Sequence, residues 1–143
     1  MDNIQVRPAV EGDEAALAAL VTELGYPSTI EQLRNRLARI AANPDHATFV
    51  AEKAGAVIGM VGVSLNLSYD HDTPVARLTG VVVTEGARGN GVGGRLLLCA
   101  EEWARERGAH QLALTSHLRR IDAHTFYRRR GFEETGRRFA KQL

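Results

Sequence analysis

The sequence predicts a mixed α/β fold in which a mostly antiparallel central sheet is flanked by about four helices. Two patterns carry this prediction: three successive strand-like segments separated by turn residues, and a later strand–helix–strand arrangement that favours a parallel pair. The chain has 143 residues, of which 44% are hydrophobic and 24% are charged. This size and composition are typical of globular proteins, so we expect a single domain over residues 1–143.

The N-terminal part reads as a short strand followed by a helix. Gln5–Arg7 can form the strand, which Pro8 closes. Apolar residues then recur at helical spacing, and they predict an amphipathic helix from about Asp13 to near Gly25. This apolar stripe consists of Leu17, Leu20, Val21 and Leu24.

A second helix is predicted directly after the first. Ser28 is followed three residues later by Glu31, a capping-box pattern that marks a helix start. Asn43 and Pro44 should end this helix. Its apolar face consists of Ile30, Leu33, Leu37 and Ile40.

Three strands should follow as an antiparallel meander. Thr48–Glu52 reads as a strand, and the turn Lys53–Gly55 leads into a longer one. Apolar and polar or small residues alternate over 61–68, which predicts one buried face and one polar face. After the turn Tyr69–Pro74, Val75–Val83 reads as the third strand.

The second half alternates helices and strands. Helical spacing begins at Gly91 and ends at Arg107–Gly108, with Val92, Leu96, Cys99 and Trp103 on one face. Gln111–Thr115 is predicted as a strand and Ala123–Arg130 as a helix. Phe132–Phe139 is expected to return to extended structure as a last strand.

Charge and cysteine content limit the functional classes. A net charge of +1 gives no global argument for nucleic acid or membrane, although the segment from Arg119 to Lys141 is basic. No apolar run approaches the ~18 residues of a membrane helix, and the N-terminal residues lack a signal-like apolar stretch. We therefore expect a cytoplasmic protein. Cys99 is the only cysteine, so we expect a buried thiol and no intrachain disulfide.

The segment Arg88–Gly94 contains four glycines between a predicted strand and a predicted helix. Backbone amides and the helix dipole bind phosphate groups well at such a position. A Walker A loop is excluded, because Arg95 and Leu96 stand where it needs lysine and a hydroxyl residue. A dinucleotide fold fits poorly, because the apolar run Leu112–Leu114 stands where it needs an acidic residue.

A third phosphate-binding pattern, [RQ]-x-x-G-x-[GA], is matched by Arg88, Gly91 and Gly93. Downstream, Ala123–Phe132 matches A-x-x-F-Y-x-x-x-G-F. With both motifs in this order, the chain resembles GNAT-type N-acetyltransferases over nearly its whole length. The resemblance implies the GNAT fold, with a splayed parallel strand pair at the CoA site, and acetyl-CoA as the co-substrate.

The resemblance also implies site residues. In the family, the loop amides bind the CoA pyrophosphate and the preceding strand pairs with the pantetheine arm. The implied cofactor-binding residues are Val81, Val82, Val83, Arg88, Gly89, Asn90, Gly91, Val92, Gly93 and Gly94. A Val81 or Val82 amide would contact the acetyl carbonyl oxygen, and Tyr127 matches the tyrosine that protonates the CoA sulfur. Arg120 is a departure, because many relatives have an asparagine there, and it puts that asparagine's contact in question.

These residues imply acetyl transfer to a primary amine by direct attack in a ternary complex. A phenol with a pKa near 10 is a suitable acid for a leaving thiolate. The general base is left open among Glu52, Asp70, His71, Asp72, Glu85 and His117. We expect no metal, since the Asp70–Asp72 run is interpreted as a solvated turn.

Two alternatives are kept beside this reading. One is a non-catalytic CoA-binding or assembly domain of the same fold. The other is a nucleic-acid-binding module that uses Arg128–Arg130 and Arg137–Arg138, although we do not expect nucleic acid as a partner. The acceptor is left open as a small-molecule or peptide amine. Its entrance should be lined by Gly25–Arg39 and Tyr69–Pro74. A homodimer is compatible with the resemblance, because family members often dimerise.

Overall fold

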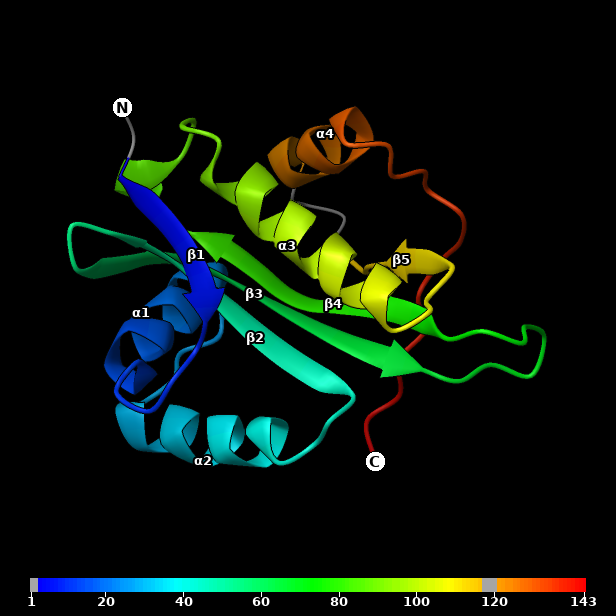
Figure 1. Ribbon diagram of the computed structural model, residues 1–143, viewed down its shortest axis with the longest axis horizontal. Coiled ribbons are helices and arrows are strands. Elements are labelled where there is room, and N and C mark those ends of the chain that lie inside the picture. Colours follow the sequence, from blue (N-terminus) through cyan, green and yellow to red (C-terminus); the bar gives the residue numbers. More distant parts are fainter. Residues whose placement is uncertain (1–2, 117–120) are drawn as a thin grey trace.

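The computed structural model describes residues 3–116 and 121–143 and contains a five-stranded mixed sheet (Figure 1). The strands lie side by side in sequence order, with the first three pairings antiparallel and the last one parallel. They are β1 (Ile4–Pro8), β2 (His46–Lys53), β3 (Ala56–Asn66), β4 (Val75–Val83) and β5 (Gln111–Ala113). The predicted mixed α/β architecture with a parallel pair is confirmed.

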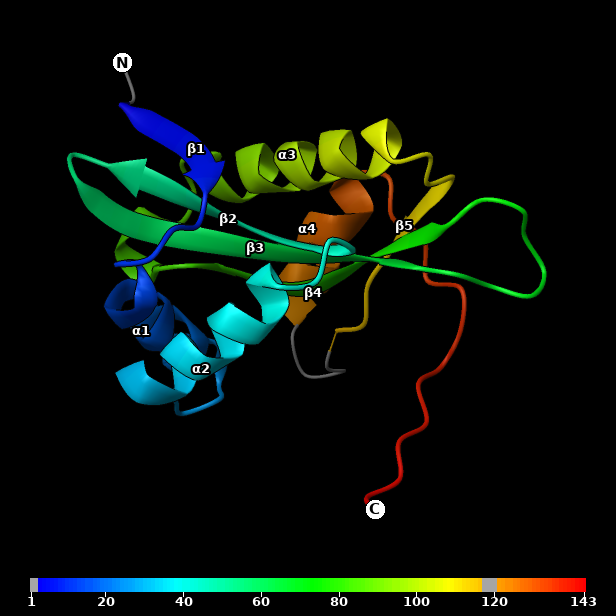
Figure 2. The ribbon, with the colours of Figure 1, turned by 60° about the horizontal axis from the view of Figure 1, so that its bottom comes forward.

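Helices cover both faces of the sheet (Figure 2). The first two helices, α1 (Glu14–Leu24) and α2 (Ile30–Ala41), lie on one face, where Leu17, Val50 and Val82 belong to one core cluster. On the other face, α3 (Val92–Glu106) packs its apolar side on the sheet, and Tyr127 of α4 (Ile121–Arg129) joins the same core. The sheet therefore separates two cores, and α3 and α4 share one of them.

The central strand β3 departs from the predicted polar and apolar faces. Val61 and Val63 are buried toward α3 as expected, but Ser64 on the opposite face is also only 4% exposed. The reason is that β3 lies between two other strands in a sheet covered on both faces, so small residues fill its second face. Leu67 lies beyond the end of the strand and is exposed.

The capping box of α2 is one residue later than predicted. The Thr29 hydroxyl accepts a hydrogen bond from the Gln32 N–H at 3.1 Å, and the Gln32 side chain accepts from the Thr29 N–H at 2.9 Å. Ser28 with Glu31 and Thr29 with Gln32 both satisfy the capping pattern in the sequence. Ser28 is instead held in the loop between the helices, where its N–H donates to the Thr22 hydroxyl at 3.0 Å.

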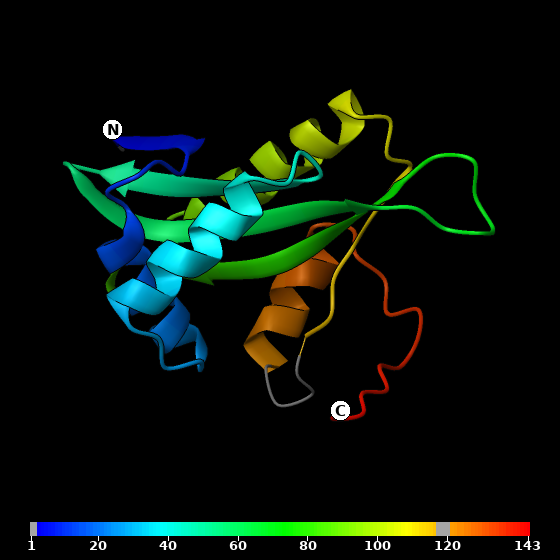
Figure 3. The same cartoon turned by 90° about the horizontal axis from the view of Figure 1, so that it is seen from below.

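Two predictions about the C-terminal half are wrong in part. Residues 132–139 form no strand, and β5 ends at Ala113 rather than Thr115. The polar run Glu133–Arg138 offers no apolar face to bury, and the tail extends away from the sheet (Figure 3). Cys99 is partly buried, because it lies at the margin of the buried stripe of α3, and burial raises the pKa of its thiol.

An ion-pair network that the sequence did not indicate joins β1 to the start of α1. Asp13 is 7% exposed and accepts hydrogen bonds from both terminal nitrogens of Arg7, at 2.9 and 3.0 Å. The Val10 N–H donates to the same carboxylate at 2.8 Å, and Arg7 Nε donates to Glu52 at 3.1 Å. The Arg7 hydrogen bonds hold the pKa of Asp13 below its usual value.

We expect Asp13→Asn to lower the free energy of unfolding by about 2 kcal/mol, because it leaves the Arg7 guanidinium without its closest counter-charge. The lowered pKa means that the carboxylate stabilises the folded state above the unfolded value of 3.8, and that this stabilisation is lost as the pH falls through the lower folded value. Urea unfolding at pH 7 and pH 3 measures both effects, with Glu11→Gln in the exposed turn before Asp13 as the control. Equal unfolding midpoints for wild type and Asp13→Asn at pH 7 would contradict this assignment.

Candidate active site

The two parallel strands separate within the sheet. β4 pairs with β5 at Val75–Gln111, Ala76–Leu112 and Arg77–Ala113, and the pairing stops there. The rest of β4, up to Val83, has no strand on that side among the described residues. Its backbone N–H and C=O groups on this edge are therefore available to a ligand that binds like an added strand.

A β-bulge in β4 marks the start of this separation. Thr79 has no partner in the register, since Gly62 pairs with Gly80 and Val63 pairs with Leu78. A Cβ on Gly62 would collide with the Thr79 hydroxyl, so the glycine makes room for the bulged residue.

The side chains of the three predicted cofactor-binding valines belong to the cores. Val81 and Val83 pack toward α3, whereas Val82 packs toward α1 and α2. Their backbone N–H and C=O groups are therefore the atoms that these valines can offer to a ligand.

A cavity of about 360 Å³ lies where the strands separate. Three segments and one helix contribute to its wall: the end of α1, the bulged part of β4, the chain after β5, and α4. The lining residues are Leu24, Gly25, Tyr26, Leu78, Thr79, Gly80, Val81, Leu114, Thr115, Ser116 and Tyr127. The structure thus brings Val81 and Tyr127 to one cavity.

The cavity corrects part of the predicted entrance. Gly25 and Tyr26 belong to it, but no residue from 27 to 39 lines it. No residue of Tyr69–Pro74 lines it either, because this turn lies at the far end of the β3–β4 hairpin (Figure 1). Sequence reasoning missed Thr115 and Ser116, whose only signal was their position after an apolar strand. The Ser116 hydroxyl is buried and has no hydrogen-bond partner among the described residues.

Tyr127 is fixed by aromatic packing. Its side chain is 8% exposed, and its ring meets those of Phe126 and Phe132 edge-to-face, with centroid distances of 5.4 and 5.7 Å. The Phe132 N–H also donates to the Tyr127 carbonyl at 3.1 Å. The A-x-x-F-Y-x-x-x-G-F motif therefore forms one packed unit that orients the tyrosine at the cavity.

The glycine-rich loop joins β4 to α3. It follows a short 3₁₀ helix, η1 (Glu85–Ala87), and its residues Gly89 and Gly91 have φ angles of +85° and +78°. Among the residues that the structure describes, nothing lies within 4 Å of a Cβ placed on either glycine, so the loop surface is open to them there. Gly91 is the N-cap of α3 and supplies no side-chain cap, which leaves the first amides of the helix suited to an anion.

Arg88 is engaged with its own chain. Its Nε donates to the Val83 carbonyl at 2.9 Å and its Nη2 to Glu23 at 3.3 Å. Asn90 donates to the Ala87 carbonyl at 3.5 Å, and Val92 is buried in the core. These residues of the motif shape the loop, and Glu23 had no local signal that linked it to the loop.

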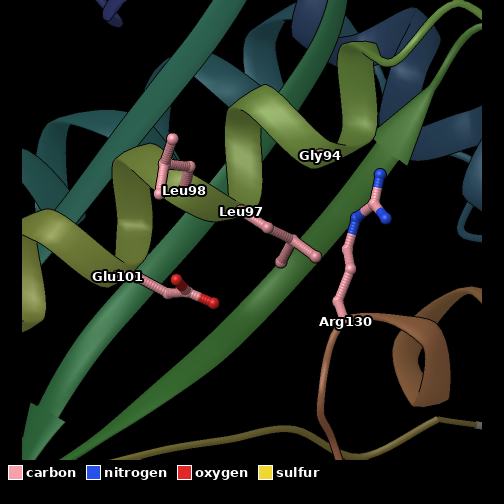
Figure 4. A pocket seen from close by; sticks show the side chains of 5 residues that line it. All are labelled: Gly94, Leu97, Leu98, Glu101 and Arg130. Carbon is pink, nitrogen blue, oxygen red and sulfur yellow. The ribbon is translucent and has the colours of Figure 1, made fainter.

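Gly93 and Gly94 let α4 approach α3. A Cβ on Gly93 would lie 3.0 Å from the Phe126 ring, and one on Gly94 would collide with the Arg130 guanidinium. Arg130 in turn lies 4.3 Å from the Phe126 ring centroid. Figure 4 shows Arg130 pointing toward Gly94. Gly94 and Arg130 line a pocket of about 320 Å³ together with Leu97, Leu98 and Glu101. Gly93 therefore helps to place the helix that carries Tyr127, and Gly94 leaves room for the Arg130 side chain.

No general base can be assigned from the candidates. Glu52 is paired with Arg7, and Asp70 lies 3.2 Å from His71 in the distal hairpin turn. None of the described candidates lines the cavity. His117 and Arg120 lie outside the described residues.

The described part of the chain contains no group of three or more histidine, cysteine, aspartate or glutamate residues placed to hold a metal ion. In the same residues, no helix has the length and apolar character needed to cross a membrane.

Comparisons with known sequences identify relatives of the whole chain. The sequence model of the acetyltransferase (GNAT) family matches residues 14–132. Aminoalkylphosphonate N-acetyltransferase of Salmonella typhimurium is 31% identical over 140 residues, which cover 97% of this chain and 91% of that protein. Aminoglycoside N(6')-acetyltransferase type 1 of Stenotrophomonas maltophilia is 35% identical over 136 residues, covering 92% and 88% of the two chains.

Solved structures share the fold. A GNAT family acetyltransferase of Staphylococcus aureus superimposes with a TM-score of 0.84 and 26% identity, covering all of both chains. AAC(6')-Iy in complex with the bisubstrate analog CoA-S-monomethyl-acetylneamine gives a TM-score of 0.86 at 21% identity, covering 99% and 98% of the two chains.

Proposed function

The chain belongs to the acetyltransferase (GNAT) family and is an acyltransferase, and from this premise we propose that it moves an acetyl group from acetyl-CoA to a primary amine by direct attack in a ternary complex. The observation that carries the proposal is the meeting of Tyr127 with the separated edge of β4 at one cavity. The acceptor is a small-molecule or peptide amine. Relatives named for aminoalkylphosphonates and aminoglycosides support the small-molecule class.

The residues present fit the co-substrate. The open backbone at Gly89 and Gly91 and the start of α3 suit a diphosphate, because amides and the helix dipole converge there. The unpaired edge at Val81–Val83 suits the amide groups of a pantetheine arm. Acetyl-CoA would supply the thioester that the reaction consumes.

Two chemical requirements, a donor to the developing oxyanion and an acid for the leaving sulfur, then have a group in the chain. The proton of the attacking amine passes to solvent, since no described residue is assigned as its base. In this proposal a backbone N–H of Val81 or Val82 would donate to the carbonyl oxygen as negative charge develops on it. The Tyr127 hydroxyl would give its proton to the departing sulfur. We place the amine at the part of the cavity wall that Leu24, Gly25 and Tyr26 form.

The test is a screen of amines with acetyl-CoA, read by release of free thiol. The panel should contain an aminoalkylphosphonate, an aminoglycoside, a polyamine and peptides with free N-termini. We also expect acetyl-CoA at about 100 times its Kd to stabilise the folded protein by about 2.7 kcal/mol. Stabilisation without turnover of any amine would favour the non-catalytic CoA-binding alternative, and no stabilisation would contradict the co-substrate.

A further inference from the structure

Glu23 joins the end of α1 to the segment that begins the glycine-rich loop. Its carboxylate accepts three hydrogen bonds: from the Thr84 hydroxyl at 3.0 Å, from the Glu85 N–H at 2.7 Å and from Arg88 Nη2 at 3.3 Å. These donors are 61 to 65 residues away in the sequence. The contact is therefore a tertiary one that local structure does not require.

The position of Glu23 is unfavourable for the helix itself. It lies in the last turn of α1, which contains no basic residue, and a negative charge at a helix C-terminus opposes the helix dipole. The Arg88 guanidinium compensates this charge from the loop. This position is explained if the Glu23 carboxylate stabilises the loop rather than the helix.

The segment held by Glu23 sets where the open loop begins. The Thr84 N–H donates to the Ile58 carbonyl at 2.8 Å, and Arg88 Nε donates to the Val83 carbonyl at 2.9 Å. Together with Glu23, these bonds fix both ends of η1. Gly89 follows at once with its positive φ and open surface. The direction of the loop amides thus depends on a segment that α1 anchors.

The same helix end forms part of the cavity wall. Leu24, Gly25 and Tyr26 line the cavity directly after Glu23. One side chain therefore ties the wall on which we place the amine to the loop on which we place the diphosphate. A shift of the end of α1 would move both.

We propose that Glu23 is a positioning residue, whose carboxylate holds the loop so that its amides meet the diphosphate of the donor. The inference rests on the proposed function. Glu23 does not touch the donor. Its carboxylate accepts hydrogen bonds from Thr84, Glu85 and Arg88, and the Arg88 guanidinium offsets its negative charge beside the proposed anion site.

The experiment compares wild type, Glu23→Ala and the control Glu31→Ala, an exposed glutamate of α2. We expect Glu23→Ala to raise the Kd of CoA, measured by calorimetry, about tenfold, since three bonds to a charged group are lost. The value of kcat/KM for acetyl-CoA should fall by a similar factor. With S-acetylpantetheine, which lacks the diphosphate, kcat/KM should change less than about twofold, because that donor does not use the loop. Glu31→Ala should match wild type with both donors.

Three outcomes overturn the proposal: an unchanged CoA Kd in Glu23→Ala, an equal loss with both donors, or an equal loss in Glu31→Ala. An equal loss with both donors would indicate a general effect on the fold. If Glu23→Ala does not fold, Glu23→Gln takes its place in the same measurements. Its amide oxygen can still accept hydrogen bonds, while the charge pairing with Arg88 is lost. Failure of wild type to bind CoA would count against the proposed function, whereas normal wild-type binding with an unaffected variant would count against Glu23 alone.

Discussion

Tyr127→Phe is expected to lower kcat at least about a hundredfold while the Kd of acetyl-CoA changes less than about twofold. The substitution removes only the hydroxyl. The phenylalanine ring keeps its edge-to-face contacts with Phe126 and Phe132, which hold this part of α4 in the core. The departing thiolate would then have to take its proton from solvent, so the loss should appear in the chemical step.

The pH dependence of kcat separates this role from a packing role. A general acid works only while it holds its proton, so wild-type kcat should decline at alkaline pH and the decline should be absent in Tyr127→Phe. Tyr69→Phe is the matched control, because Tyr69 is fully exposed in the distal hairpin turn and does not line the cavity. Full activity of Tyr127→Phe across the alkaline range would remove the acid assignment.

Local patterns in the sequence predicted the helices and strands better than they predicted which residues of each element are buried. The apolar stripe of α1 and the turn at residues 53–55 depend on neighbours in the sequence, and both were predicted correctly. The burial of Ser64 depends on which helices cover the sheet, which no local pattern contains. The start of α2 was ambiguous for a different reason: two adjacent residues offer the same capping pattern, and Thr22 decides between them by bonding Ser28.

In the candidate site, too, local motifs were predicted and distant contacts were not. The spacing of Arg88, Gly91 and Gly93 located the loop, and the second motif located Tyr127. Sequence reasoning could not find Glu23, because its partners are more than sixty residues away and its own surroundings form an ordinary helix end. It predicted Gly93 as a ligand contact, and the structure adds a packing reason for this glycine beside Phe126.

Gly91→Val is expected to raise the Kd of acetyl-CoA about a hundredfold or more, through the loop rather than through the core. Gly91 has a φ of +78°, which a β-branched residue adopts only at a cost of about 1–2 kcal/mol or more. The loop must therefore change its backbone to accept valine, and the amides at the start of α3 lose their alignment. The new side chain would also fill the open space through which a diphosphate reaches those amides.

Gly86→Ala is the matched control for Gly91→Val. Gly86 lies in η1, five residues earlier in the same connection, and has no positive φ. No residue of the described ranges lies within 4 Å of a Cβ added there. Alanine there should leave the Kd within about twofold of wild type, because neither strain nor occlusion arises. Titration calorimetry well below each variant's Tm keeps any loss of stability apart from the loss of binding. If Gly91→Val binds acetyl-CoA as tightly as Gly86→Ala, the diphosphate does not approach the backbone at Gly91, and the assignment of this loop to the donor fails.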